Sequence, residues 1–160
     1  MLAFNESLVA LNSDAADART VIELLAGRLH AQGLVTADYG RLTYERELEH
    51  PTGLPTTPFC IAFPHADAAG VHTSGLALAT LSKAVTFKNM GDPDQVLDVF
   101  LVLMLANRNP EEQIQTLRNL ALLFGQPEKL KTLRDQATSA AAVTWLRREL
   151  RLDASASGKA

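Results

Sequence analysis

The sequence predicts a single α/β domain in which helices cover a mixed β-sheet. Apolar runs of strand length alternate along the chain with stretches whose apolar residues recur at helical spacing. The last of these runs is apolar on both alternating faces except at Asp98, as a central strand covered by helices would be. The 160 residues are enough for one domain with a real core. The expected strands are Ser7–Leu11, Phe59–Phe63, Gly75–Leu81 and Val96–Ala106.

Two helices are expected in the N-terminal third of the chain. Apolar residues at one-face spacing predict a helix over 14–31, with Gly33 as a left-handed residue just beyond its end. A second helical stretch opens at Thr36 and ends by His50, because Pro51 disfavours helical geometry in the residue before it. The segment that follows is rich in proline and is expected to be a loop.

The C-terminal third carries clear helix boundaries. Asn109 can cap a helix that has Pro110 at its first position, with Glu112 placed for a capping box. Gly125 is expected to end this helix. Further helices are expected from Pro127 to Leu133 and from a cap at Thr138 or Ser139 to Leu150, with a turn at Gly91–Asp94 and a flexible tail over 153–160.

Composition and charge exclude several functional classes. The formal net charge is -3 and Lys and Arg are scattered, so the sequence shows no basic stripe for nucleic acid or anionic lipid. A single cysteine, Cys60, excludes an internal disulfide and a multi-thiolate metal site, which fits a reducing compartment. No glycine-rich phosphate loop indicates a nucleotide site. The N-terminus does not resemble a signal peptide and the longest apolar run, Val99–Ala106, is too short to cross a bilayer, so a cytoplasmic protein is expected.

His65 is the residue best placed for chemistry. It follows Pro64 just beyond the expected strand Phe59–Phe63, where a stiff backbone can project a side chain from the edge of the sheet. A neutral imidazole is nucleophilic near neutral pH. On spacing alone, an ordinary surface or core histidine fits the same position.

Two other kinds of site compete for this segment. His65, Asp67 and His72 could ligate a metal, although their spacing matches none of the compact metal motifs. Cys60 could act as a thiol nucleophile, but it lies inside an apolar strand, where a free cysteine is usually a small core residue. No metal or other cofactor is therefore expected.

Phosphoryl chemistry at a histidine would also need positive charge for the phosphate oxygens. Arg46, just before the proline-rich loop, is the candidate. The alternative is that Arg46 is a solvated helix residue paired with Glu45, Glu47 or Glu49.

Three stretches carry a resemblance to a known family. Arg46-Glu47, Pro51-Thr52-Gly53-Leu54 and Ile61-Ala62-Phe63-Pro64-His65 resemble the IIA components of the bacterial sugar phosphotransferase system (PTS) in the fructose, mannitol and nitrogen class. The resemblance covers residues 5 to 150 and implies the mannitol-type IIA fold, with an EIIA type-2 domain over residues 1–152.

The resemblance implies a role for each of these stretches. His65 would accept a phosphoryl group from the phosphocarrier HPr and pass it to a IIB component, with the IIC membrane permease as an indirect partner. Arg46 would stabilise the phosphoryl group, and Thr52 would line the same pocket. Leu54 and Phe63 are candidates for a partly apolar rim on which the partners dock.

One position departs from the pattern. Mannitol- and fructose-type members often carry a second active-site histidine early in the helix after the long buried strand, and this chain has Gln113 there. A neutral amide cannot act as a base, but it can hydrogen-bond an imidazole or a phosphate oxygen. The glutamine and the Pro-Thr-Gly-Leu loop are most similar to galactitol-type IIA proteins.

Two further functions stay open on the sequence. One is a regulatory IIA of the nitrogen type, in which phosphorylation of the same histidine controls binding to other proteins. The other is an unrelated metal or cysteine hydrolase.

Overall fold

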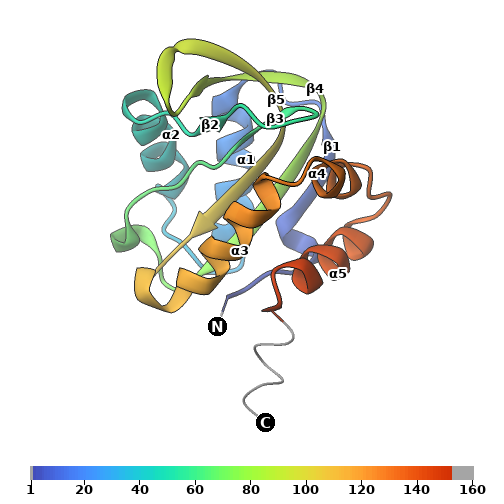
Figure 1. Cartoon of the computed structure of the whole chain (residues 1–160). Coiled ribbons are helices and arrows are strands. Elements are labelled where there is room, and N and C mark those ends of the chain that lie inside the picture. Colours follow the sequence, from blue (N-terminus) through green and yellow to red (C-terminus); the bar gives the residue numbers. More distant parts are fainter. Residues whose placement is uncertain (1, 153–160) are drawn as a thin grey trace.

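Two long antiparallel strands form the centre of the computed structural model, which describes residues 2–152 (Figure 1). They are β4 (Gly75–Asn89) and β5 (Asp92–Ala106), each of 15 residues. Their pairing begins with Gly75 opposite Ala106, and irregularities interrupt the register twice before the turn. Both strands are longer than the sequence predicted. β5 extends toward the turn through the exposed residues 92–95, which carry no apolar signal, and β4 extends through exposed residues that alternate with the buried Val85 and Phe87.

The turn between β4 and β5 lies closer to the N-terminus than the predicted turn at Gly91–Asp94. Only residues 90 and 91 are in the turn, and β5 already begins at Asp92. The Asn89 side chain explains the difference, since its Oδ1 accepts a hydrogen bond of 2.9 Å from the Gly91 backbone N–H. This local bond closes a tight turn before the proline of the expected segment is reached.

The other three strands attach to this hairpin. β1 (Val9–Ser13) pairs parallel to β4, and β3 (Cys60–Ala62) pairs parallel to β5. The two-residue strand β2 (Gly53–Leu54), which the sequence did not predict, pairs antiparallel to β3 and meets the end of β4 at Asn89. The sheet is therefore mixed, as predicted.

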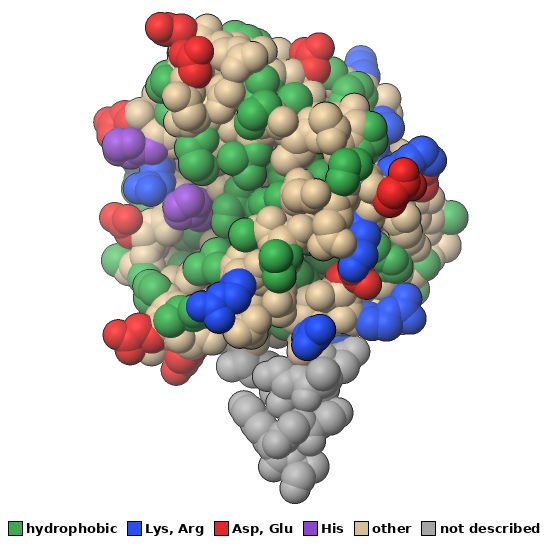
Figure 2. All heavy atoms as spheres, viewed as in Figure 1, with side chains coloured by type: hydrophobic (Ala, Val, Ile, Leu, Met, Phe, Trp, Pro, Cys, Tyr) green, Lys and Arg blue, Asp and Glu red, His purple; other side chains and the backbone are tan. Residues whose placement is uncertain are grey.

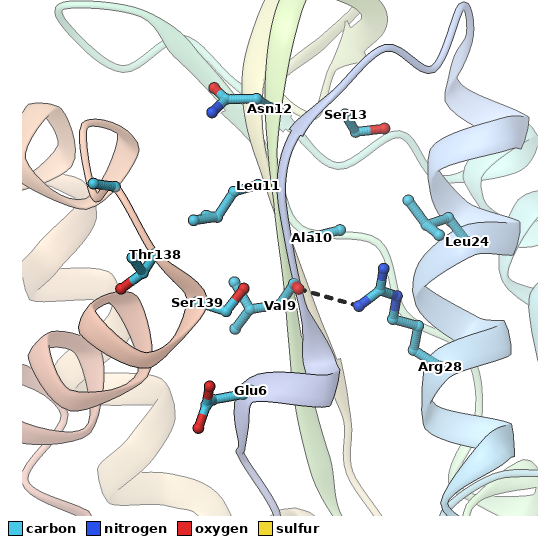
Figure 3. A pocket seen from close by; sticks show the side chains of 11 residues that line it. Glu6, Val9, Ala10, Leu11, Asn12, Ser13, Leu24, Arg28, Thr138 and Ser139 are labelled. Carbon is cyan, nitrogen blue, oxygen red and sulfur yellow. Dashed lines mark hydrogen bonds between the residues drawn. The ribbon is translucent and has the colours of Figure 1, made fainter.

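Helices cover the sheet from both sides (Figures 1 and 3). Figure 3 shows α1 on one side of β1 and α5 on the other. No helix within residues 2–152 is long and apolar enough to cross a membrane. The helices are α1 (Ala18–Ala31), α2 (Tyr39–Glu49), α3 (Ile114–Phe124), α4 (Pro127–Arg134) and α5 (Ser139–Glu149), with short 3-10 helices at Glu6–Leu8, Ala68–Gly70 and Pro110–Gln113.

Several predicted boundaries needed correction at the N-terminus. The first helix starts at Ala18 and not at residue 14, because the Asp17 carboxylate accepts a hydrogen bond of 2.8 Å from the Thr20 N–H and caps it there. The strand expected over Ser7–Leu11 is shifted to β1, since a 3-10 helix occupies the residues before it. The left-handed conformation predicted for Gly33 is confirmed by its φ of 72°.

The C-terminal helices follow the predicted boundaries more closely. Asn109 caps the predicted start of the helix after β5. The first turn is a 3-10 helix, however, and α3 begins only at Ile114. Thr138 caps α5 and Gly125 ends α3, as predicted. The tail expected over 153–160 lies outside the described residues.

The hydrophobic core lies between the β4–β5 hairpin and the helices. One continuous cluster of buried apolar side chains joins the helices to the strands. Completely buried members include Leu25 and Leu29 of α1, Leu76 and Leu78 of β4, and Leu101 and Leu103 of β5.

Gly53→Ala should destabilise the protein, because a Cβ at this position would lie 2.5 Å from the Lys88 carbonyl oxygen and 3.2 Å from Leu97. We expect the free energy of unfolding to fall by about 2 kcal/mol in urea denaturation. Gly27→Ala is the control, since no atom lies within 4 Å of its added Cβ and alanine favours a helix interior by about 1 kcal/mol. Equal stability of the two variants would contradict the close contact between β2 and β4.

Candidate functional site

His65 lies just beyond the C-terminal end of β3 and is half-buried. Its Nδ1 is 3.1 Å from the carbonyl oxygen of Phe63. A carbonyl oxygen can only accept a hydrogen bond, so Nδ1 carries the proton and donates a hydrogen bond to the Phe63 carbonyl oxygen. In a neutral ring this leaves the lone pair on Nε2.

The backbone before His65 is held through Phe63. The Phe63 N–H is within hydrogen-bond distance of both oxygens of Thr52, at 3.3 Å from the carbonyl and 3.2 Å from Oγ1. The Phe63 ring packs edge-to-face on Phe124 of α3, with 5.8 Å between centroids. It also lies 6.0 Å from the His65 imidazole. Phe63 therefore connects the histidine with both the loop before β3 and the helix α3.

The backbone after His65 is held by Tyr39, the first residue of α2. The Tyr39 hydroxyl accepts a hydrogen bond of 3.2 Å from the Ala66 N–H. Tyr39 is completely buried, and this burial raises the pKa of its hydroxyl. The phenol therefore stays protonated at neutral pH, and the bond to Ala66 fixes the segment on the far side of the histidine.

A buried carboxylate holds Thr52. Glu47 Oε2 accepts a hydrogen bond of 2.8 Å from the Thr52 N–H, and Oε1 accepts another of 2.8 Å from the Thr52 hydroxyl. Both residues are almost fully buried, with 8% of Glu47 and 3% of Thr52 exposed. Burial raises the pKa of Glu47, although the two bonds from Thr52 and the charge of Arg46 oppose this shift.

Arg46 is half-buried and, within residues 2–152, makes no ion pair. Its Nε is buried and has no hydrogen-bond partner there. The pairing with neighbouring acids that the sequence left open is absent: Glu45 pairs with Arg41 at 3.2 Å, and Glu47 bonds to Thr52. Within these residues the Arg46 guanidinium is thus in no close ion pair, and its charge acts on Glu47 only at longer range.

A hollow of about 390 Å³ lies beside Arg46. Residues from two segments line it: the last turns of α2, including His50, and the segment after His65, which begins with Ala66 and Asp67. Arg46 therefore borders open space next to the segment that follows His65, and Glu45, Glu49 and Asp67 line the same hollow.

Gln113 ends the short 3-10 helix before α3 and is 5% exposed. Within residues 2–152 no hydrogen bond joins its amide to His65 or to any other residue. Leu54 and Phe63 are half-buried, and Ile114 and Leu117 of α3 are 53% and 37% exposed. Figure 2 shows hydrophobic side chains gathered beside histidine and basic side chains on this face.

The rival sites find little support in the geometry. Burial raises the pKa of the Cys60 thiol, and the charge of Asp98 raises it further, which is the opposite of nucleophile activation. No group of three or more His, Cys, Asp or Glu side chains in residues 2–152 is placed to hold a metal ion.

The sequence analysis missed Tyr39 and did not recognise the structural role of Glu47. Both residues point inward from α2, as does Thr43. A usable signal was present, because these residues fall on one helical face and leave α2 without the apolar stripe that a covering helix normally has. The partner of Tyr39 is a backbone N–H 27 residues away, and Glu47 bonds to both the N–H and the hydroxyl of Thr52; the sequence pattern indicates neither pairing.

A second hollow, of about 580 Å³, lies between β1, α1 and α5 (Figure 3). Arg28 is its basic group, and its guanidinium donates to the carbonyl oxygens of Ser7 and Val9 at 3.2 and 3.1 Å. These bonds connect α1 with the first residue of β1 and with the 3-10 helix before it. None of the residues that hold His65 lines this hollow.

Comparisons with known proteins show the family and the fold of this chain. Residues 2–148 match the family described as EIIA 2 of the phosphoenolpyruvate-dependent sugar phosphotransferase system. The galactitol-specific EIIA component of Escherichia coli K12 is 31% identical over 117 residues, covering 73% of this chain and 77% of that protein.

Solved structures of the same fold include mannitol and nitrogen-regulatory proteins. Enzyme IIA of the mannitol system from Escherichia coli, solved in complex with phosphorylated enzyme IIB, is 21% identical with a TM-score of 0.69, covering 94% of this chain and 99% of that chain. The nitrogen regulatory protein IIA-Ntr from Neisseria meningitidis is 23% identical with a TM-score of 0.70, covering 88% of this chain and 94% of that chain. The predicted mannitol-type fold is confirmed.

The raised pKa of Glu47 predicts a pH dependence of stability. The pKa of Glu47 in the folded protein lies above the usual 4.5. At pH values between 4.5 and this raised pKa, the folded state therefore binds more protons than the unfolded state. The contribution of Glu47 to the free energy of unfolding should therefore fall as pH rises through this window. Urea denaturation from about pH 4 upward, comparing wild type with Glu47→Gln, measures this contribution.

Glu23→Gln, which replaces an exposed carboxylate on α1, is the matched control. A difference between wild type and Glu47→Gln that grows with pH would show that the bonds from Thr52 and the charge of Arg46 outweigh the cost of burial.

Proposed function

Because this chain belongs to the EIIA type-2 family of the phosphoenolpyruvate-dependent sugar phosphotransferase system, we propose that His65 carries a phosphoryl group from HPr to a IIB component. The observation that supports this most directly is the hydrogen bond from Nδ1 to the Phe63 carbonyl. It leaves Nε2 as the nitrogen with a lone pair in the half-buried side chain.

The transfer is an in-line displacement at phosphorus. Nε2 of His65 attacks the phosphorus of the donor's phosphohistidine, and a new N–P bond forms as the donor's N–P bond breaks. The donor imidazole leaves with the electron pair of the broken bond. The proton on Nδ1 stays in place, and its bond to Phe63 stabilises the positive charge that the ring acquires. Transfer to IIB is the same displacement with the phosphorylated His65 as donor.

Arg46 is proposed to bind the phosphoryl oxygens. Its guanidinium is free of any carboxylate within the described residues, and it lines the hollow next to Ala66. A guanidinium donates parallel N–H bonds to phosphate oxygens and neutralises the charge that spreads over them in the transition state. Gln113 would add a neutral donor that orients the ring or the phosphate.

HPr and IIB are proposed to dock in turn on the face around His65. Half-buried Leu54 and Phe63 and exposed Ile114 and Leu117 supply apolar surface for a modest, transient contact. The partly apolar face in Figure 2 agrees with this role. The mannitol enzyme IIA of similar fold was solved with phosphorylated IIB, and a IIB component is the partner of the same kind that we propose here.

The system served by this protein is proposed to be galactitol-like. The supporting evidence is the 31% identity to the galactitol-specific EIIA component, together with Gln113 in place of a second histidine. A IIC permease would then be an indirect partner, and the protein would work in the cytoplasm without a cofactor. The similarity to the nitrogen regulatory protein shows the fold alone and favours no regulatory role.

His65→Ala should abolish phosphorylation. Purified protein incubated with phosphoenolpyruvate, enzyme I and HPr should gain one phosphoryl group by mass spectrometry, and the wild-type product should be phosphorylated on Nε2 by NMR. His72→Ala, which removes an exposed histidine elsewhere on the surface, should be labelled like the wild type. A wild type that never gains phosphate would refute the proposed function.

The second half of the cycle tests the proposed partner. Phosphorylated protein should lose its label to the galactitol IIB component faster than to the mannitol IIB component. A phosphorylated protein that transfers to neither component would argue against the transport role while leaving His65 as the phosphorylated residue.

Arg46→Gln should slow phosphorylation about ten- to hundredfold, because it removes a charge-assisted contact worth about 1.5–3 kcal/mol. Rapid-quench measurements of label transfer from phosphorylated HPr give the rate. Arg41→Gln is the matched control on the same helix, since Arg41 is exposed and, among residues 2–152, pairs only with Asp38 and Glu45. Equal rates for the two variants would remove Arg46 from the mechanism.

A further inference from the structure

Three hydrogen bonds in sequence connect a buried carboxylate with the ring of His65. The Thr52 hydroxyl donates to Glu47 Oε1 at 2.8 Å, and the Phe63 N–H donates to Thr52 Oγ1 at 3.2 Å. The third bond runs from His65 Nδ1 to the Phe63 carbonyl oxygen at 3.1 Å. Glu47 itself does not touch His65, so any effect on the histidine passes through Thr52 and Phe63.

Glu47 determines which way the Thr52 hydroxyl points. A carboxylate only accepts hydrogen bonds, so the hydroxyl hydrogen is directed at Oε1 and the oxygen keeps a lone pair for the Phe63 N–H. The second carboxylate oxygen accepts from the Thr52 N–H and fixes the backbone of the same residue. Without the Glu47 acceptor the Thr52 hydroxyl could rotate. Its hydrogen would then point at the Phe63 N–H, to which the hydroxyl oxygen has to present a lone pair.

The Phe63 carbonyl is well suited to orient a histidine. The residue that follows is Pro64, which is buried and has no N–H. The Phe63 ring is packed against Phe124, so the residue is held by its side chain as well as by its N–H. With Phe63 fixed at both points, its carbonyl oxygen is a stationary acceptor for Nδ1.

We propose that Glu47 and Thr52 are positioning residues that hold the His65 imidazole, through the Phe63 backbone, in the tautomer that presents the Nε2 lone pair to a phosphoryl donor. This inference rests on the proposed function of His65. It extends that function to two buried residues that contact neither the phosphoryl group nor a partner.

The unfavourable burial of Glu47 is consistent with this role. Burial raises the pKa of this carboxyl, so keeping it ionised in the core has a cost. An apolar side chain at this position would avoid the cost but would leave both the N–H and the hydroxyl of Thr52 without an acceptor. The geometry therefore requires at residue 47 a group with two acceptor atoms.

The same helix holds the other side of the histidine. Tyr39 accepts from the Ala66 N–H, and Tyr39 and Glu47 lie two turns apart on α2. The segment between Phe63 and Ala66 is thus attached to one rigid helix at both ends. A displacement of the imidazole relative to α2, and hence to Arg46, would break one of these bonds.

The test uses Thr52→Val, which keeps the shape of the side chain and removes the hydroxyl, together with Glu47→Gln. The ¹⁵N NMR spectrum of the His65 ring should show a mixture of tautomers in both variants, where the wild type shows the proton on Nδ1. The kcat for phosphorylation by phosphorylated HPr should fall about ten- to hundredfold, with KM unchanged because the docking surface is intact.

Two variants separate positioning from simple loss of stability. Thr52→Ser restores the hydroxyl and should recover both the tautomer and kcat. Thr80→Val is the matched control, since Thr80 is also completely buried and its Oγ1 accepts from a backbone N–H, that of Asn12, at 2.8 Å. It should lose stability and leave the His65 spectrum and kcat unchanged.

A wild-type tautomer and wild-type kcat in Thr52→Val would overturn the proposal. Equal loss of kcat in Thr80→Val would also overturn it, because the effect would then follow from stability alone. If the wild type itself never accepts phosphate, the proposed function fails, and the NMR spectra still decide whether Glu47 and Thr52 set the tautomer.

Discussion

The ladder of backbone hydrogen bonds between β4 and β5 fixes where the other strands can lie. β1 takes the free edge of β4, and β3 takes the free edge of β5. β2 then connects β3 with the far end of β4, where Gly53 approaches the Lys88 carbonyl too closely for any larger residue. Because His65 follows β3 by three residues, its location is set by the register of Ala62 opposite Val102 of β5.

The sheet places the histidine, and α2 supplies the groups around it. Successive residues on a helix point in different directions, so Glu45, Arg46 and Glu47 have different neighbours. Glu45 pairs along the helix surface with Arg41, and Glu47 points inward to Thr52. Arg46 therefore keeps its charge available even though acids flank it in the sequence, which is what a phosphate-binding guanidinium requires.

The sequence was sufficient for the fold class and for most helices, because apolar periodicity and caps are local signals. It also supplied His65 and Arg46 as the two residues proposed to contact phosphate. It was insufficient for β2, which is too short to have a pattern, and for the tight turn at Asn89, which depends on one side-chain bond. It also gave no role to Glu47, because its link to the histidine runs through backbone groups brought together by folding.

Gln113 stands where mannitol- and fructose-type members often have a second histidine, and this difference changes how the proposed site would respond to pH. A second histidine would titrate near neutrality, and the positive charge offered to the phosphoryl group would then vary with pH in that range. A glutamine has no charge to lose, so the proposed positive charge at the site would come from the guanidinium of Arg46 alone. The geometry of the proposed site accordingly depends on buried bonds such as that from Thr52 to Glu47, and its proposed positive charge depends on Arg46.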